Sequence, residues 1–411
     1  IFISAGDHDG VDNVVHLMLA KIEGAPAGVK GISLFVVPKK RIDDSGNLIP
    51  NDVVASGVHH KLGYRGCPIV QLSMGDRNDC RGWLVGEPHS GLKYMFQMMN
   101  EARLLVGLQG LACASSAYMY AVNYARERVQ GRHLLKAQED DAPSVPIIEH
   151  PDIRRMLLTM KAYVEGMRSL LYFIGNCEDK FRLSTQEVDK ARYHGLIDLL
   201  IPIAKGYVTD KAFEICSLGV QVYGGYGYIK EYPMEQLLRD CRITQIYEGT
   251  NGIQSMDFLA RKLGMNEGKP VMDLLGEIQQ TLGAAKAISK LESAAAKVEA
   301  AVNKLGEVML HIGQAAISMD TRMSAFAHAY SFMEVCGDVV FAWLLLWRAT
   351  LAAQNLENGA KKKDAAFYEG QLKSVEFFVH CVLPVTLGKM DGILATNSAV
   401  VDIAEDSFGG K

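Results

Sequence analysis

The sequence predicts an α+β protein with several domains: an antiparallel β-domain, then a helical bundle, then an additional helical domain. Three observations support this prediction. Residues 1–88 consist of short β-prone stretches separated by Gly, Pro, Asp and Asn. Apolar residues recur at helical spacing through residues 89–263. The same spacing returns in residues 264–411, beyond a polar break, and we therefore expect three domains with these bounds.

The first domain is expected to be a compact antiparallel β-structure. The stretches 13–19, 31–37 and 69–74 are β-prone, and turn-forming residues separate them. The chain opens on Ile1 with an alternating pattern that is typical of a strand, and it shows no signal sequence. We therefore expect this chain to be a fragment or a processed product.

The second domain is expected to be an antiparallel helical bundle. Residues 90–124 have the apolar spacing of one long helix. A second helix is predicted to begin at Pro151, because proline is tolerated at the first helical position. A third helix is predicted over residues 188–222, with a kink at Pro202 and an end at Gly224.

The third domain is expected to be helical as well. Residues 264–270 break the helical pattern with Gly, Asn, Glu and Pro, and the stretches 282–301, 308–353 and 365–387 resume it. The densest apolar run, residues 339–347, is about half as long as a bilayer crossing requires. We therefore expect no transmembrane segment.

The composition excludes several classes of function. The 411 residues include 43 basic and 47 acidic ones, a formal net charge of −4, and no basic block marks a nucleic-acid partner. The eight cysteines are scattered without a C-x-x-C pair, so we expect a reducing, cytoplasmic location. Asp7, His8 and Asp9 could supply metal ligands, but three adjacent loop residues are interpreted as a solvated turn, and no metal is expected. Phe341, Trp343 and Trp347 are interpreted as core, in preference to a peripheral membrane surface.

Two glycine-containing clusters are the candidates for chemistry. Residues 221–228 read Q-V-Y-G-G-Y-G-Y, where bare backbone N–H groups could approach a phosphate or carbonyl, although a glycine helix cap is the simpler alternative. Residues 246–254 read I-Y-E-G-T-N-G-I-Q, where Glu248 has apolar and aromatic neighbours and Thr250 can cap a following helix. A general base and a structural carboxylate are equally consistent with Glu248 by itself.

The two clusters together resemble the acyl-CoA dehydrogenase family in order and spacing. Between them lies E-Y-P-x-E-x-x-x-R-D, and the early segments F-I-S at residues 2–4 and K-L-G-Y-R-G at residues 61–66 resemble family motifs too. The resemblance covers about residues 1–262. Residues 264–411 are similar to the extra helical domain of large bacterial members, in the subgroup that contains 3-methylmercaptopropionyl-CoA dehydrogenase and broad-specificity fatty acyl-CoA dehydrogenases.

The resemblance implies FAD-dependent α,β-dehydrogenation of an acyl-CoA to the trans-2-enoyl-CoA. Glu248 matches the general base that removes the α-proton while the β-hydride passes to flavin N5. Some members carry the base on the long helix instead, but the corresponding position, directly before Arg103, is Ala102. Asn100, Arg103 and Gly249 would contact the acyl-CoA.

The resemblance also implies an FAD site shared across a homodimer or larger homo-oligomer. Gln221, Gly224 and Gly225 would reach the FAD of the neighbouring subunit, and Arg128 its phosphates. The residues assigned to the chain's own FAD are Phe2 and Ser4 at the isoalloxazine ring, together with Thr250, Asn251 and Gly252.

Further expectations follow from the same resemblance. An electron-transferring flavoprotein would accept the electrons. The enzyme would act in fatty acid metabolism, in β-oxidation. The family's N-terminal helical domain is not found in this chain. An acyl-CoA oxidase and a catalytically silent binding or assembly relative are the alternatives.

Overall fold

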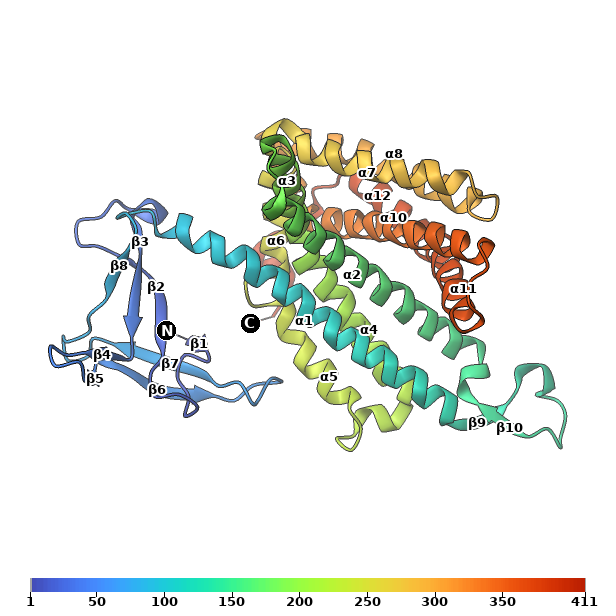
Figure 1. The fold of residues 1–411 in the computed structure, drawn as a ribbon, viewed down its shortest axis with the longest axis horizontal. Coiled ribbons are helices and arrows are strands. Elements are labelled where there is room, and N and C mark those ends of the chain that lie inside the picture. The colour runs from blue at the N-terminus through green and yellow to red at the C-terminus, as the bar shows by residue number, and fades with distance from the viewer. Residues whose placement is uncertain (1, 411) are drawn as a thin grey trace. The chain divides into compact units, whose positions relative to one another are not determined.

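The computed structural model describes residues 2–410, apart from the side chain of Gln97, and it has the predicted α+β architecture (Figure 1). It divides into two compact units, Ile1–Ala102 and Arg103–Lys411. The predicted domain boundaries at residues 88 and 263 stay predictions. Ile1, with which the first expected strand begins, lies outside the described residues.

The first unit is built from antiparallel strands, as predicted. One sheet has the order β1-β7-β6, a second has the order β2-β3-β8, and β4 pairs with β5. Its small core is formed by the buried side chains of Val37, Val53, Val70 and Leu72. The strands are β1 (Phe2–Ser4), β2 (Val15–Lys21), β3 (Ile32–Pro38), β4 (Lys40–Ile42), β5 (Leu48–Pro50), β6 (Val53–His59), β7 (Ile69–Met74) and β8 (Trp83–Val85).

The second unit consists mainly of helices. A short hairpin of β9 (Val129–Arg132) and β10 (Ser144–Pro146) interrupts them. The helices are α1 (Gly91–Glu127), which begins in the first unit, α2 (Pro151–Leu183), α3 (Glu187–Pro202), α4 (Val208–Tyr223), α5 (Met234–Cys241), α6 (Asn251–Asp257), α7 (Lys269–Lys286), α8 (Glu292–Ile317), α9 (Arg322–Ala327), α10 (Ala329–Glu357), α11 (Lys362–Phe377), α12 (Leu383–Leu394) and α13 (Ala399–Asp402).

Local sequence signals fix several helix ends. Proline at the first position opens α2, as predicted, with Asp152 in the first turn where a negative charge complements the helix dipole. Gly224 ends α4 with a φ of +60°, a conformation that glycine adopts without steric cost. The predicted kink at Pro202 takes the form of a π-helical turn, Ile203–Tyr207, between α3 and α4. Proline cannot donate an intrahelical hydrogen bond, and such wide turns accommodate the irregularity.

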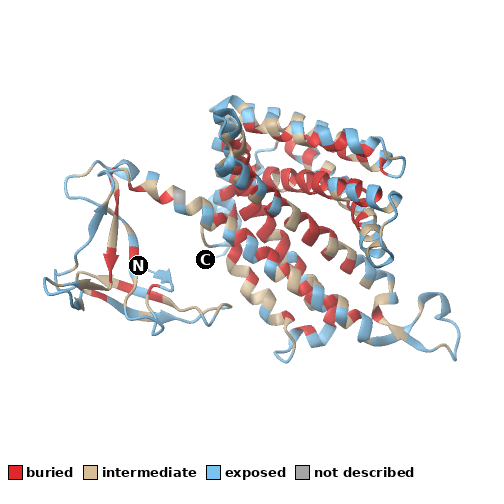
Figure 2. Cartoon of the chain, viewed as in Figure 1, coloured by how far each residue is buried: buried red, intermediate tan, exposed pale blue. Residues whose placement is uncertain are grey.

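Helix α10 is the centre of the second unit. It packs against α2, α7, α8, α11 and α12, and buried residues line it along its length in Figure 2. Phe341 and Trp343 are fully buried, as the core interpretation predicted, whereas Trp347 remains 37% exposed. The core continues past the break at residues 264–270, where Asn266 and Glu267 have positive φ angles.

The expectation that no segment is long and apolar enough to span a membrane is wrong. Among the described residues, three helical stretches are long and apolar enough: Gly91–Glu127, Ala329–Glu357 and Lys362–Leu394. In α10, 83% of the apolar window is buried inside the protein, so its apolar side chains form part of the core. The sequence-based expectation considered only the dense apolar run at residues 339–347. It missed long helices in which the apolar residues are spread out.

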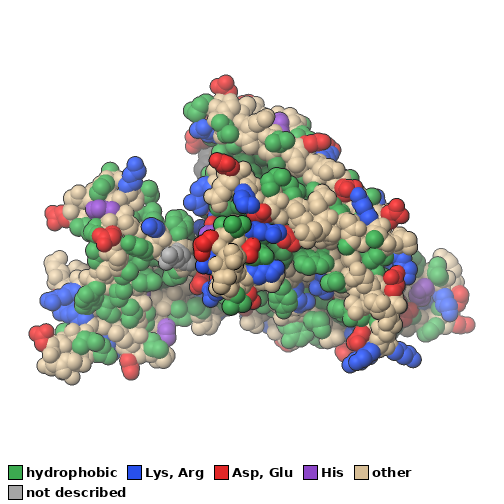
Figure 3. Space-filling model, turned by 45° about the horizontal axis from the view of Figure 1, so that its top comes forward, with side chains coloured by type: hydrophobic (Ala, Val, Ile, Leu, Met, Phe, Trp, Pro, Cys, Tyr) green, Lys and Arg blue, Asp and Glu red, His purple; other side chains and the backbone are tan. Residues whose placement is uncertain are grey.

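Acidic and basic side chains are interspersed over the second unit on the face shown in Figure 3. The mixture agrees with the nearly balanced composition.

The packing of α10 on the π-helical turn gives the first prediction. A Cβ atom added to Gly337 would lie 2.3 Å from Cγ of Tyr207, a fully buried ring. We expect Gly337→Ala to lower the free energy of unfolding by about 1–3 kcal/mol, because overpacking forces the helices apart. Urea denaturation followed by circular dichroism measures this change.

Gly276→Ala is the matched control. Gly276 is exposed on α7, and no atom lies within 4 Å of an added Cβ. We expect it to raise stability by up to about 1 kcal/mol through helix propensity. Equal stability of the two variants would contradict the proposed close contact.

Candidate active site

Glu248 lies on a strained turn directly before α6. Its φ is +57° and that of Gly249 is +87°, so two successive residues have left-handed backbone. A non-glycine residue in this region is uncommon, and such strain is often found at functional sites. The Thr250 side chain accepts a hydrogen bond of 3.3 Å from the Ile253 N–H, which confirms the predicted helix cap. The turn therefore holds a half-buried carboxylate at a helix N-terminus.

Gly249 is required by the geometry of this turn. A Cβ atom at this position would lie 2.7 Å from Nε2 of Gln254. The Gln254 amide is buried, and it donates to the carbonyl oxygen of Glu248 at 3.5 Å. The Tyr247 hydroxyl also donates to Gln109 on α1, which ties the turn to a second helix.

Asn251 directs its side chain into the protein. Its Oδ1 accepts a hydrogen bond of 2.8 Å from the ammonium of Lys205, and its Nδ2 lies 2.7 Å from Oδ1 of Asp210. The same Nδ2 lies within hydrogen-bonding distance of the Gly206 carbonyl and the Thr209 hydroxyl. The amide thus joins α6 to the π-helical turn. Its predicted contact with FAD stays a prediction.

Lys205 is a fully buried lysine close to the candidate base. Burial lowers the pKa of its ammonium to about 8. The carboxylates of Asp210 and Glu248 act in the opposite direction, and the positive charge of Arg103 lowers the pKa further. Sequence reasoning missed Lys205 and Asp210. The available signal was a lone lysine in the apolar run that follows Pro202.

Arg103 adds a second buried cation. Its guanidinium lies 3.9 Å from Oδ2 of Asp257 on α6, and only 5% of the residue is exposed. Its Nε makes no hydrogen bond to the part of the chain that the structure describes. An unpaired buried donor of this kind is costly unless a ligand or water satisfies it. Asn100 lies on the same helix, α1, within the first unit. Gly252 is exposed in the first turn of α6.

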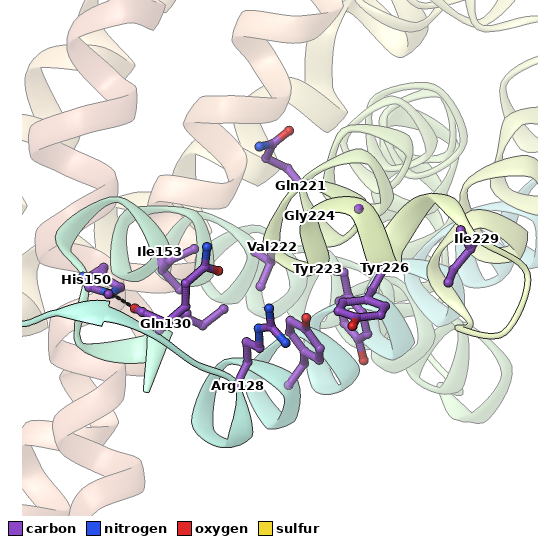
Figure 4. A pocket seen from close by; sticks show the side chains of 14 residues that line it. Arg128, Gln130, His150, Ile153, Gln221, Val222, Tyr223, Gly224, Tyr226 and Ile229 are labelled. Atoms are coloured by element: carbon purple, nitrogen blue, oxygen red, sulfur yellow. Dashed lines mark hydrogen bonds between the residues drawn. The ribbon is translucent and has the colours of Figure 1, made fainter. Parts of the chain in front are cut away.

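A second set of predicted residues lines one pocket of about 760 Å³ (Figure 4). Gln221, Gly224 and Gly225, at the end of α4, contribute one side of it, and Arg128 contributes from the end of α1. No atom lies within 4 Å of a Cβ added to either glycine, so their backbone faces open space. The other lining residues are Tyr124, Gln130, Gly131, Ile147, His150, Ile153, Val222, Tyr223, Tyr226 and Ile229.

Aromatic rings and one positive charge dominate this pocket. The Arg128 guanidinium lies over the Tyr226 ring, 5.3 Å from its centroid. Tyr124 stacks on Tyr223 with a centroid distance of 4.0 Å. Sequence reasoning had not assigned these tyrosines, although two of them belong to the glycine-rich cluster. The Glu248 turn does not contribute to the lining of this pocket. The assignment of the two clusters to different FAD molecules stays a prediction.

Phe2 and Ser4 lie in the first unit. They belong to β1, where Phe2 pairs with Gln71 and Ser4 with Ile69 of β7. Phe2 is 66% exposed, and its ring makes an edge contact with His59 at a centroid distance of 4.6 Å. An exposed aromatic ring of this kind is available for a ligand.

Comparison with known proteins decides the family. Residues 89–263 match the family model "Acyl-CoA dehydrogenase, C-terminal domain", and residues 274–404 match "Acetyl-CoA dehydrogenase C-terminal like". A butyryl-CoA dehydrogenase of Syntrophomonas wolfei is 36% identical over 99% of this chain and 67% of its own length. The chain belongs to the acyl-CoA dehydrogenase family. The family resemblance of the two glycine-containing clusters is thereby confirmed.

One further relative and one solved structure are similar to this chain. The 3-methylmercaptopropionyl-CoA dehydrogenase of Ruegeria pomeroyi is 37% identical over 93% of this chain and 63% of its own length. The solved structure of Caenorhabditis elegans ACDH-11 in complex with C11-CoA has a TM-score of 0.73 at 23% identity, which shows the acyl-CoA dehydrogenase fold. The match covers 91% of this chain and 57% of that one. The chain thus spans about two thirds of the length of its curated relatives.

The environment of Lys205 gives the second prediction. Its pKa is about 8 in the folded protein, against an ordinary value of 10.5. Between these values the unfolded state binds more protons, so stability rises as the pH increases through the folded pKa. We expect a gain of about 2 kcal/mol from this residue. Urea denaturation at about pH 7 and about pH 10, in the parent and in Lys205→Met, measures it.

NMR titration of Cε-labelled lysines provides a direct readout. One resonance should titrate near pH 8 and be absent from Lys205→Met. If every lysine instead titrates near its ordinary value, Lys205 is not a desolvated ammonium.

Proposed function

We propose that this protein is an FAD-dependent acyl-CoA dehydrogenase in which Glu248 is the general base. The supporting observation is the left-handed turn at Glu248 and Gly249, which holds a half-buried carboxylate at the N-terminus of α6. The buried ammonium of Lys205 interacts electrostatically with this carboxylate and with the buried guanidinium of Arg103. The substrate is an acyl-CoA thioester, oxidised to the trans-2-enoyl-CoA.

The residues of this chain fit FAD. Arg128 supplies a positive charge suited to a pyrophosphate, and the neighbouring tyrosines supply faces on which a planar ring can stack. Gly224 and Gly225 allow close backbone approach at the same pocket. Bound FAD would supply the two-electron acceptor for the β-hydride. Phe2 and Ser4 would contact the isoalloxazine, and Thr250, Asn251 and Gly252 the chain's own cofactor.

Glu248 has to remove a weakly acidic α-proton. The Gln254 amide holds the Glu248 carbonyl, and the neighbouring Tyr247 hydroxyl is bonded to Gln109. Because the turn is held at both residues, the carboxylate needs little reorganisation before it accepts the proton. The Glu248 backbone N–H is the donor expected to polarise the thioester carbonyl, which acidifies the α-carbon. The positive charge of Lys205 interacts favourably with the ionised carboxylate. Arg103, Asn100 and Gly249 would line the acyl-CoA site.

The family pattern extends this proposal to partners and location. Gln221, Gly224 and Gly225 would complete a site in a neighbouring subunit, so the enzyme is a homodimer or larger. An electron-transferring flavoprotein is the proposed acceptor, in the cytoplasm. Oxygen consumption during turnover would instead indicate an acyl-CoA oxidase.

Glu248→Gln is the first test of the proposal. In the full-length protein reconstituted with FAD, anaerobic addition of acyl-CoAs should bleach the flavin absorption. We expect the variant to slow bleaching by about 10²–10⁴-fold, because the amide cannot accept the α-proton. Trials with butyryl-CoA, longer acyl-CoAs and 3-methylmercaptopropionyl-CoA would identify the substrate class.

Glu101→Gln is its matched control. Glu101 lies on α1, one residue from the position that carries the base in some family members. Its substitution should leave the bleaching rate unchanged. A parent protein that binds FAD but is bleached by no acyl-CoA would refute the proposed reaction. Loss of activity only in Glu101→Gln would show that Glu101, and not Glu248, is the base.

Arg128→Met tests the cofactor pocket. Removing a charge-assisted contact to phosphate should weaken FAD binding by about 10–100-fold. Fluorescence titration of the apoprotein with FAD measures this affinity. Arg126→Met is the control, because Arg126 is exposed in the last turn of α1, two residues before Arg128, and does not line the pocket. Equal FAD affinity of the two variants would rule out the phosphate contact.

A further inference from the structure

A single carboxylate closes the turn that carries Glu248. Asp210, on α4, accepts a hydrogen bond of 2.7 Å from Nε2 of Gln245 and another of 2.7 Å from Nδ2 of Asn251. Both bonds go to its Oδ1. Gln245 is the residue before the five-residue turn 246–250, and Asn251 is the residue after it. Asp210 therefore holds the two ends of the turn together.

The other oxygen of Asp210 is held by the C-terminal helices. The Tyr330 hydroxyl, near the start of α10, donates a hydrogen bond to Oδ2 of Asp210. This contact joins residues that are 120 positions apart. A carboxylate that is bonded through both oxygens has a fixed orientation, so Tyr330 determines where Oδ1 points.

Helix α10 is a rigid support for Tyr330. Phe332 stacks on Phe258, which directly follows α6, with a centroid distance of 5.6 Å. Further along α10, the Tyr207 hydroxyl donates to the buried carboxylate of Asp338. Both contacts anchor α10 against the segments that flank the Glu248 turn. Displacement of Tyr330 would therefore require repacking of the core.

We propose that Tyr330 is a positioning residue for the Glu248 turn, acting through the clamp that Asp210 forms between Gln245 and Asn251. The C-terminal helical segment thereby takes part in organising the active site. This inference rests on the proposed dehydrogenase function for its kinetic consequence. Its structural part, that Tyr330 restricts the mobility of the Glu248 turn, does not depend on any reaction.

Tyr330→Phe removes the hydroxyl and keeps the ring. Tyr330 is 43% exposed, so the variant leaves the core intact. Tyr368→Phe is the matched control, because Tyr368 lies on α11 of the same segment and its hydroxyl makes no hydrogen bond to the described part of the chain. Both variants are made in the full-length protein loaded with FAD.

The first readout is hydrogen–deuterium exchange. Tyr330→Phe should speed exchange several-fold in peptides that cover residues 246–253 and leave those that cover residues 362–377 unchanged. Tyr368→Phe should leave the turn unchanged. Equal exchange at the turn in the parent and in Tyr330→Phe overturns the inference, whether or not the protein oxidises acyl-CoAs.

The second readout is the rate of flavin reduction by saturating butyryl-CoA. We expect Tyr330→Phe to lower this rate by about tenfold, since small displacements of a base reduce proton transfer strongly. The acyl-CoA concentration for half-saturation should change by less than about twofold. With α-deuterated substrate, the isotope effect should increase in Tyr330→Phe only. A loss that appears entirely as weaker acyl-CoA binding would contradict a positioning role. A parent that reduces no flavin would refute the proposed function, and the exchange result would still decide the inference.

Discussion

A buried positive charge organises the part of the helical unit that carries Glu248. Removing an ammonium from water is costly, and the cost is compensated only where polar partners surround the group. Lys205 obtains one such partner from the Asn251 amide, which in turn binds Asp210. Because Asn251 is the first residue of α6, satisfying this charge also fixes where that helix begins. The Glu248 turn is thus bounded by a helix start that a buried lysine holds in place.

Long-range packing makes this arrangement stable. The interior helix α10 has apolar residues on nearly all sides, and it contacts both the π-helical turn and α6. Its small residue Gly337 lets the Tyr207 ring approach, and Tyr207 then reaches Asp338. Burial raises the pKa of the Asp338 carboxyl, while the bonds from Tyr207 and from Thr386 favour its charged form. Polar contacts inside an apolar helix bundle specify one alignment of these helices.

The sequence predicted what depends on neighbours along the chain. Pro151, Gly224 and Thr250 mark helix ends through backbone and side-chain chemistry that operates within a few residues. The family motifs located both glycine-containing clusters. In contrast, the bond between Lys205 and Asn251 joins residues 46 positions apart, and no periodicity encodes it. The same holds for the tyrosines that complete the Arg128 pocket, because only folding brings α1 and α4 together there.

The π-helical turn at Ile203–Tyr207 makes the number of residues in this segment as important as their identity. A π-helical turn contains an additional residue compared with an α-helical turn. Deleting one residue there would leave a continuous α-helix but change the directions in which the side chains of the turn, Lys205 among them, point. Lys205 would then be displaced from the Asn251 amide, although no functional side chain had been altered. A change in chain length could thus disable the site while the helix, and every motif in it, remained recognisable.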